Sequence, residues 1–171
     1  MAERKEDVFA NIYQLTLTES APVTLTFVEI NMGLTLFQKK AILISRIVID
    51  WGWVTMQALV EAADSIMVGL TASDQLESLA LRDSACIWKA QKGIIWHGTP
   101  ANAEVVNVVN VYDLSGIPGG GEFVVPSPLY GAIHGASLVA AQSVTMRIYF
   151  QIVELKPEEY FELLESRHFF G

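Results

Sequence analysis

The stretch from Ser143 to Phe170 is the part of the sequence that most constrains the fold. Apolar residues recur there at every second position, at Val144, Met146, Ile148, Phe150 and Ile152. Successive side chains of a β-strand point to opposite faces, so this period of two places all five on one buried face. Tyr149, Val153 and Leu155 add apolar surface to the other face, which predicts partial cover there as well. The pattern predicts a long strand inside a β-domain.

A C-terminal helix is predicted to begin directly after this strand, near Pro157. Proline suits the first helical position because its φ angle is already helical and that position needs no N–H donor. Glu158 and Glu159 follow, where the positive end of the helix dipole favours carboxylates. An apolar stripe at helical spacing then predicts that the helix docks on a surface, and it comprises Tyr160, Leu163 and Leu164. Two aromatic residues, Phe169 and Phe170, lie beyond it and are expected to need cover.

The rest of the chain indicates nine or ten β segments. The clearest have alternating or β-branched residues at 11–18, 23–30, 42–53, 65–70 and 104–112. In the last of these the valines run almost without interruption, which is typical of a strand covered on both faces. One short helix is expected at Ser73–Asp83, because Ser73 or Asp74 can cap it and Leu76, Leu79 and Ala80 have helical spacing. We therefore expect an all-β protein with a short helical insertion and a C-terminal helix.

Composition predicts one domain that associates with other subunits. A length of 171 residues suits a single domain with its own core. From Ser84 to Val153 there are six charged residues, a sparse set for the surface of a lone monomer: Lys89, Lys92, Glu104, Asp113, Glu122 and Arg147. Large apolar surfaces on soluble proteins usually mark interfaces. We expect residues 1–10 to form an arm, 11–155 the β-domain and 156–171 the helix and tail.

The charge balance argues against a protein that grips nucleic acid. The net charge is −8 and the isoelectric point about 4.8, whereas affinity for a phosphate backbone depends on clustered Lys and Arg. Residues 1–7 carry charges of both signs and no basic region that leads into an apolar run, so no signal peptide is expected. The longest uncharged stretch is interrupted by proline and glycine, so no transmembrane segment is expected. Cys86 is the single cysteine, and its apolar neighbours favour a core position over a nucleophilic role.

No motif in the sequence predicts catalysis. The glycine-rich run at 116–121 lacks the Gly-Lys-Ser/Thr ending of a phosphate-binding loop, and no Gly-X-Ser-X-Gly turn is present. His97, Glu104 and His134 are the weak alternative for a metal site, since their spacing does not match a His-X-His arrangement. Otherwise no cofactor, metal or catalytic residue is predicted. Trp51 and Trp53 are expected to serve as anchors in a core or a subunit interface.

The segment SVTMRIYFQIVELKPEEYFELLE, residues 143–165, is similar to the last strand and tail of single jelly-roll coat proteins of small icosahedral viruses. This resemblance implies an antiparallel β-sandwich of jelly-roll type. It further implies a structural virion subunit without catalytic activity that self-assembles as a homo-oligomer, with or without a second coat protein. Its location would be the virion, and the host cytoplasm during assembly.

One feature departs from the coat proteins that package RNA, because residues 1–9 are not a basic arm, and strong direct binding of nucleic acid is therefore not expected. The residues expected at subunit interfaces are Trp51, Trp53, Tyr160, Leu163, Leu164, Phe169 and Phe170. Two alternatives stay open. One is a cupin-like β-barrel enzyme or small-molecule binder that uses His97, Glu104 and His134, and the other is a cellular ring-forming β-sandwich oligomer.

Overall fold

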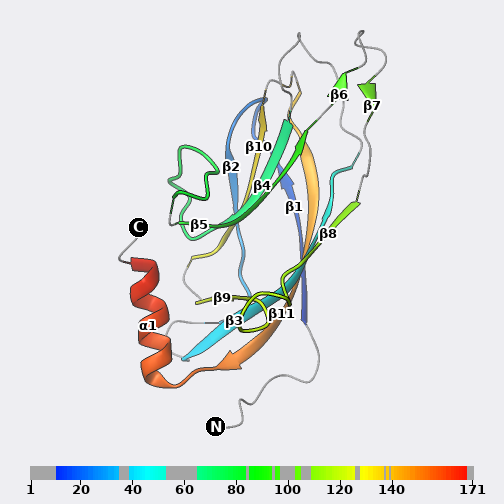
Figure 1. The fold of residues 1–171 in the computed structure, drawn as a ribbon. Coiled ribbons are helices and arrows are strands. Elements are labelled where there is room, and N and C mark those ends of the chain that lie inside the picture. The colour runs from blue at the N-terminus through cyan, green and yellow to red at the C-terminus, as the bar shows by residue number, and fades with distance from the viewer. Residues whose placement is uncertain are drawn as a thin grey trace.

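The protein is a sandwich of two antiparallel β-sheets with one helix at its C-terminal end (Figure 1). The computed structural model describes residues 11–34, 39–52, 65–83, 85–93, 95–96, 103–104, 109–125, 128–136, 138 and 140–168. The first sheet has the order β1-β11-β3-β8, with β9 also paired to β3, and the second has the order β2-β10-β4-β5. The first sheet comprises β1 (Asn11–Thr18), β11 (Ser143–Glu154), β3 (Lys40–Asp50), β8 (Val109–Asp113) and β9 (Glu122–Val124). The second comprises β2 (Thr26–Glu29), β10 (Tyr130–Ala136), β4 (Ser65–Thr71) and β5 (Cys86–Gly93).

The strand order is that of a jelly roll. When the eight strands on the two main paths are ranked by their order in the chain, the first sheet reads 1-8-3-6 and the second 2-7-4-5. All the pairings are antiparallel, and two such Greek-key sheets packed face to face define the jelly-roll arrangement. A small separate hairpin, β6 (Ile95–Trp96) with β7 (Ala103–Glu104), lies between β5 and β8 in the chain. The expected all-β sandwich is therefore confirmed.

The core lies between the two sheets and is filled by aliphatic side chains. The predicted alternation of β11 is confirmed, because Val144, Met146 and Ile148 are all buried and belong to the inter-sheet cluster. The neighbouring strand β3 and strands of the second sheet contribute further fully buried residues: Ile47, Ile49, Ile66, Val68, Leu70 and Ile133. Burial of a side chain of this size stabilises the folded state by about 1.5–3 kcal/mol. The sandwich thus closes on itself through non-directional apolar packing.

The alternation of inward and outward side chains along the central strand β3 is reversed at Ser45. The register with β11 shifts between Tyr149 and Phe150, so that Ser45 is an extra residue on β3. A bulge of one residue reverses the alternation, and accordingly Ile44 before it and Ile47 after it are both fully buried. β3 therefore contributes to the core along its whole length.

Glycines allow β1 and β10 to approach each other closely. A side chain at Gly131 would place its Cβ 2.7 Å from Leu15 Cδ1 and 2.9 Å from Leu17 Cδ2. β10 forms a strand over Tyr130–Ala136, and the absent side chain at Gly131 makes room for β1.

The C-terminal helix α1 (Pro157–His168) begins at the predicted proline and has the predicted carboxylates in its first turn. Just before it, the Leu155 N–H donates to the Lys39 carbonyl at 3.2 Å, which ties the start of the helix to the start of β3. Figure 1 shows α1 at the end of the sandwich where β11 ends. Among the described residues, no helix has the length and apolar character needed to cross a membrane.

The predicted helical insertion at Ser73–Asp83 is wrong. Residues 73–83 form bends and turns instead. The Ser73 hydroxyl accepts the Gln75 N–H at 3.1 Å, and the Asp83 carboxylate accepts the Ala85 N–H at 3.0 Å. Ser and Asp side chains that bond to nearby backbone compete with the hydrogen bonds of a helix. Leu79 is nevertheless buried, so the apolar spacing reflects tertiary packing of a loop.

Two strand predictions also need correction. The segment predicted as a strand from Val23 forms a strand only over Thr26–Glu29, because Val23 has a φ of 57°, outside the β region, and lies in a turn. The valine run at 104–112 was expected to be covered on both faces. Residues 105–108 lie outside the described residues, and among the described strands β8 is the end strand of its sheet and leaves Val109 and Val111 exposed.

Candidate interaction surface

The outer face of the first sheet carries exposed apolar side chains where β3 and β8 pair. Val48 of β3 lies opposite Val111 of β8. Val109 is two residues before Val111 in β8 and therefore lies on the same face. Val109 is 53% exposed and Val111 59% exposed, while Val48 is partly buried. We call these three residues the valine face. Exposure of contiguous branched aliphatic side chains is unfavourable in water, which makes this the leading candidate for contact with a partner.

Charges on this outer face are balanced within one chain. The outward positions of the strands hold two cations, Arg46 and Arg147, and two carboxylates, Asp50 and Asp113. Arg46 lies 3.9 Å from Asp113, and its guanidinium carbon lies 5.9 Å from the centre of the Tyr149 ring. The Arg147 Nε donates to Gln14 Oε1 at 2.8 Å. The face is thus locally neutral in a chain whose net charge is −8.

Asp113 ends β8 in an ordered, charged state. The Ser115 hydroxyl donates to its carboxylate at 2.6 Å, and the Ser115 N–H donates to the same oxygen at 2.9 Å. These two bonds from Ser115, with a smaller contribution from Arg46, hold the pKa of Asp113 below its ordinary value. The carboxylate therefore stays ionised at neutral pH and anchors the turn that follows the strand.

The strand β8 is braced from the core side. The Trp51 indole N–H donates to Asn110 Oδ1 at 2.7 Å. Tyr112 packs edge-on against Trp88 of β5, with ring centroids 5.2 Å apart, so aromatic rings join the ends of the two sheets at this edge. Both contacts use the inward residues Asn110 and Tyr112, which leaves the outward valines to the surface.

Part of the outer face of the second sheet, around Gly69, is covered by the chain itself. The β4–β5 segment, residues 72–83, lies over this sheet, and a side chain at Gly69 would place its Cβ 3.2 Å from Leu79 Cδ2. Leu79 is 3% exposed, and the Lys89 ammonium donates to the Leu79 carbonyl at 3.1 Å. The Ala72 N–H donates to the Ala85 carbonyl at 2.7 Å and closes the segment at its base. The two sheets therefore differ in what covers their outer faces.

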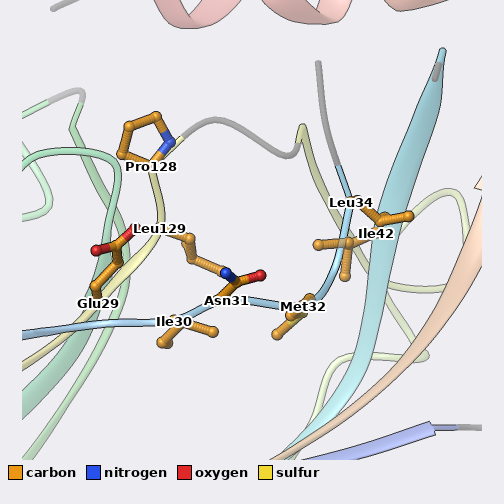
Figure 2. A pocket seen from close by; sticks show the side chains of 8 residues that line it. All are labelled: Glu29, Ile30, Asn31, Met32, Leu34, Ile42, Pro128 and Leu129. Atoms are coloured by element: carbon orange, nitrogen blue, oxygen red, sulfur yellow. The ribbon is translucent and has the colours of Figure 1, made fainter. Parts of the chain in front are cut away.

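A pocket lies at one end of the sandwich, between the β2–β3 connection and the residues before β10 (Figure 2). It encloses about 160 Å³ and is lined mainly by apolar side chains, among them Ile30, Ile42 and Leu129. Glu29 is the one titratable residue among the described residues of its lining, and the Asn31 side-chain oxygen accepts the Gly33 N–H at 2.9 Å. The described lining residues include no pair of titratable groups that would act as acid and base.

The residues of the possible metal site are not brought together in the described parts of the chain. His134 lies on β10 opposite Met67 of β4. It points away from the core, because its neighbours Ile133 and Gly135 point inward, and its buried Nδ1 has no hydrogen-bond partner. Glu104 ends β7, and His97 lies outside the described residues. Among the described residues, no group of three or more His, Cys, Asp and Glu side chains has the geometry to hold a metal ion.

The residues expected at a subunit interface fall into three groups. Trp51 and Tyr160 are 1% and 3% exposed, so the chain itself already covers them and they do not reach the expected surface. Leu163 on α1 is partly buried, and the backbone of Leu164 lies on the same helix. Trp53, Phe169 and Phe170 lie outside the described residues. The valine face was not among the interface residues expected from sequence, although the valine run that contains it was recognised.

The single cysteine is a core residue, as its sequence context predicted. Cys86 begins β5 and is buried. Burial raises the pKa of its thiol by disfavouring the thiolate, and attraction to Lys89 offsets part of this effect. A thiol with this environment is a poor nucleophile at neutral pH.

A buried carboxylate that the sequence did not reveal joins β1 to the segment before β11. Glu19 is 3% exposed, and its two oxygens accept the Gly135 N–H at 2.6 Å and the Gln142 N–H at 2.9 Å. Its own N–H donates to the Gln142 carbonyl at 2.9 Å. Gly135 and Gln142 are more than a hundred residues from Glu19 in the sequence, so no local pattern predicts this set of hydrogen bonds, which we call the Glu19 clamp. All three bonds serve the fold.

Comparison with known proteins identifies no family from sequence. No protein-family model matches the chain, and no curated protein matches it either. Among solved structures, the chain is similar to a protein chain in the X-ray structure of tomato aspermy virus. The match has 12% sequence identity and a TM-score of 0.40, and it covers 92% of this chain and 84% of the other.

Proposed function

We propose that this chain is a structural, self-assembling subunit of a virion shell and has no catalytic activity. The observation that carries the proposal is the valine face, which lies exposed on one sheet of a jelly roll whose other sheet is covered around Gly69 by a segment of the same chain. Contiguous exposed apolar side chains often mark a contact with a partner, and another copy of the chain is the simplest partner. The proposal places the protein in the virion.

The jelly-roll arrangement occurs in viral capsid proteins, lectins and cupins, so the fold alone does not choose among them. The packing of the interior favours the shell over the cupin-like alternative. A cupin-like site needs polar ligands that point into the space between the sheets, whereas fully buried aliphatic residues such as Ile49, Val68 and Ile148 occupy that space. His134, the described histidine of that alternative, faces outward.

The domain organisation fits this role. We propose that residues 11–155 form the shell domain, with residues 1–10 as an arm and residues 156–171 as a helix and tail. Leu163, Leu164, Phe169 and Phe170 remain candidates for contacts between subunits, and Trp51 and Tyr160 belong to the interior of the chain. The net charge of −8 favours a shell in which this chain does not grip nucleic acid broadly.

The test is the size and form of the purified protein. Mass by light scattering, measured over a range of protein concentration, salt and pH, is combined with negative-stain electron microscopy. We expect closed shells or regular capsomers that share one curvature. A monodisperse monomer under all conditions, or a flat ring of a few subunits, would contradict the virion-shell role, and the ring would favour a cellular oligomer.

A further inference from the structure

We propose that two copies of this chain pair through β8, antiparallel and around a two-fold axis at Val111, so that their first sheets become one continuous sheet. The inference rests on the proposed function in that it takes a second copy as the partner, and it names the surface and the symmetry of the contact. The edge of a sheet offers unpaired backbone groups to another chain. β8 is such an edge, since in the described part of the chain its far side has no partner strand.

The N–H and C=O groups of β8 point in the directions that this pairing requires. The Leu114 N–H donates to the Ser45 carbonyl at 2.8 Å, toward β3. Backbone groups alternate in direction along a strand, so those of Tyr112 and Asn110 also point toward β3. Those of Val109, Val111 and Asp113 point to the free edge. Two antiparallel copies centred on Val111 then match Val111 with Val111, and Val109 with Asp113, which gives about six hydrogen bonds.

The side chains agree with the same register. Val48 and Val111 are cross-strand neighbours, so the pairing creates a row in which Val48 and Val111 of one copy meet Val111 and Val48 of the other. Each Asp113 stays beside the Arg46 of its own chain and meets an uncharged Val109 across the new contact. Like charges directly opposite would destabilise a sheet, and this register places none there. The interface is isologous, as a two-fold axis demands.

Local neutrality allows two copies of an acidic chain to meet at this place. Arg46 and Arg147 balance Asp50 and Asp113 on the outer face. The helix α1, by contrast, carries Glu158, Glu159, Glu162 and Glu165, and two such helices would repel each other. The charge distribution therefore favours the β8 edge over α1 for contact between identical copies.

The other strands at the ends of the sheets are less suited to pairing. β5 carries Lys89 and Lys92, and lysine on an edge strand opposes addition of another strand. The outward residues of β1 include Gln14, Thr16 and Thr18, and β2 has four residues. β8 alone among these four strands carries two exposed valines on one face.

A cysteine placed at Val111 tests the register directly. Paired residues of this type have Cα atoms about 5.5 Å apart, within the range of a disulfide. Mild oxidation of Val111→Cys should convert most of the protein to a covalent dimer on a non-reducing gel. Ile12→Cys is the matched control, because Ile12 is also 59% exposed on the same sheet but lies on β1. The buried native Cys86 contributes little background.

A charge at the same position provides the second test. Val111→Lys should lower the fraction of assembled protein by about tenfold or more, since two ammonium groups would meet at the axis, while Ile12→Lys has little effect. Circular dichroism checks that both variants fold. If wild-type particles form but Val111→Cys cross-links no better than Ile12→Cys and Val111→Lys assembles normally, the inference is overturned and the proposed function survives. Cross-linked dimers without shells would support the inference and contradict the proposed function, and a strictly monomeric wild type would overturn both.

Discussion

The two sheets of this sandwich are alike in their inner faces and differ in how their outer apolar residues are covered. The second sheet buries its outward residues Thr71 and Ala132 completely, under a chain segment that brings Leu79 over Gly69. The first sheet leaves Val109 and Val111 more than half exposed on its outer face. Both faces carry apolar residues, so composition does not explain the difference. It teaches that a segment of this chain covers part of one sheet, whereas the valines of the other sheet are left exposed.

The exposed part of the first sheet is also restricted. Nearer α1, the outward residues Ala41, Leu43 and Val153 are buried. A side chain at Gly121 would place its Cβ 3.0 Å from Leu43 Cδ1, which shows that the segment before β9 lies over this region. The outer face is therefore covered at the end near α1, and it is uncovered where β3 pairs with β8 and along β1.

The largest expected effect concerns the residue that braces the exposed edge. Trp51→Ala should lower the free energy of unfolding by about 3–5 kcal/mol, because it opens a cavity in the core and removes the hydrogen bond to Asn110. Denaturant unfolding measures the change. Trp51→Phe keeps most of the packing and should cost clearly less. Equal losses in the two variants would mean that packing of the ring contributes little.

Matched truncations on the two outer faces test the comparison itself. Leu79→Ala should destabilise the protein by about 2–4 kcal/mol because Leu79 is buried over the second sheet. Val111→Ala should change the stability of the dissociated protein by less than about 0.5 kcal/mol, because the side chain is largely in water. Unfolding is measured at a concentration where the protein is monomeric. Similar values for both truncations would remove the distinction between the faces.

The covered sheet should also protect its cysteine. Burial raises the pKa of Cys86, so less thiolate is present at any pH below that value. We expect alkylation in the native state to be roughly tenfold slower or more than in the denatured protein. Mass spectrometry follows the modification over time, with the denatured protein as the reference. A native rate equal to the denatured one would show that this end of the second sheet is open.

The smallest expected effect lies on the exposed sheet. Ser115→Ala removes the main cause of the low pKa of Asp113, which should then rise toward its ordinary value. Because the folded state holds this pKa low, its contribution to stability is present above the ordinary pKa and is lost as pH falls through the lowered value. Ser115→Ala should therefore have a slightly lower free energy of unfolding than the wild type, and only at pH values above that acid range. Carboxyl titration by NMR checks the shift, and an unchanged pKa would contradict the assignment to Ser115.

Much of the fold could be predicted from the sequence because its signals are local. The alternation from Val144 to Phe150 and the start of α1 at Pro157 depend on neighbours in the chain, and the structure confirms both. The segment at Ser73–Asp83 was mistaken for a helix because Leu79 packs over a distant glycine and the spacing carries no record of that contact. The Glu19 clamp was missed for the same reason.

The candidate surface was only half predictable. The valine run predicts a strand that is buried on both faces, and the few charged residues around it indicate an interface. Neither signal says whether the cover comes from the same chain, and the aromatic residues chosen from sequence include Trp51 and Tyr160, which the chain buries itself. Whether the chain covers these valines itself depends on the strand order, and among the described strands that order places β8 at the end of its sheet.

Hydrogen exchange in the assembled and the dissociated protein tests the central claim most directly. Backbone amides of 109–113 are compared with those of 65–71 and 130–136 at high and low protein concentration. The account predicts that the amides of Val109, Val111 and Asp113 gain protection on assembly while those of β4 and β10 stay as they are. Amides of β8 that exchange at the same rate in both states would contradict the claim that a second copy covers this edge.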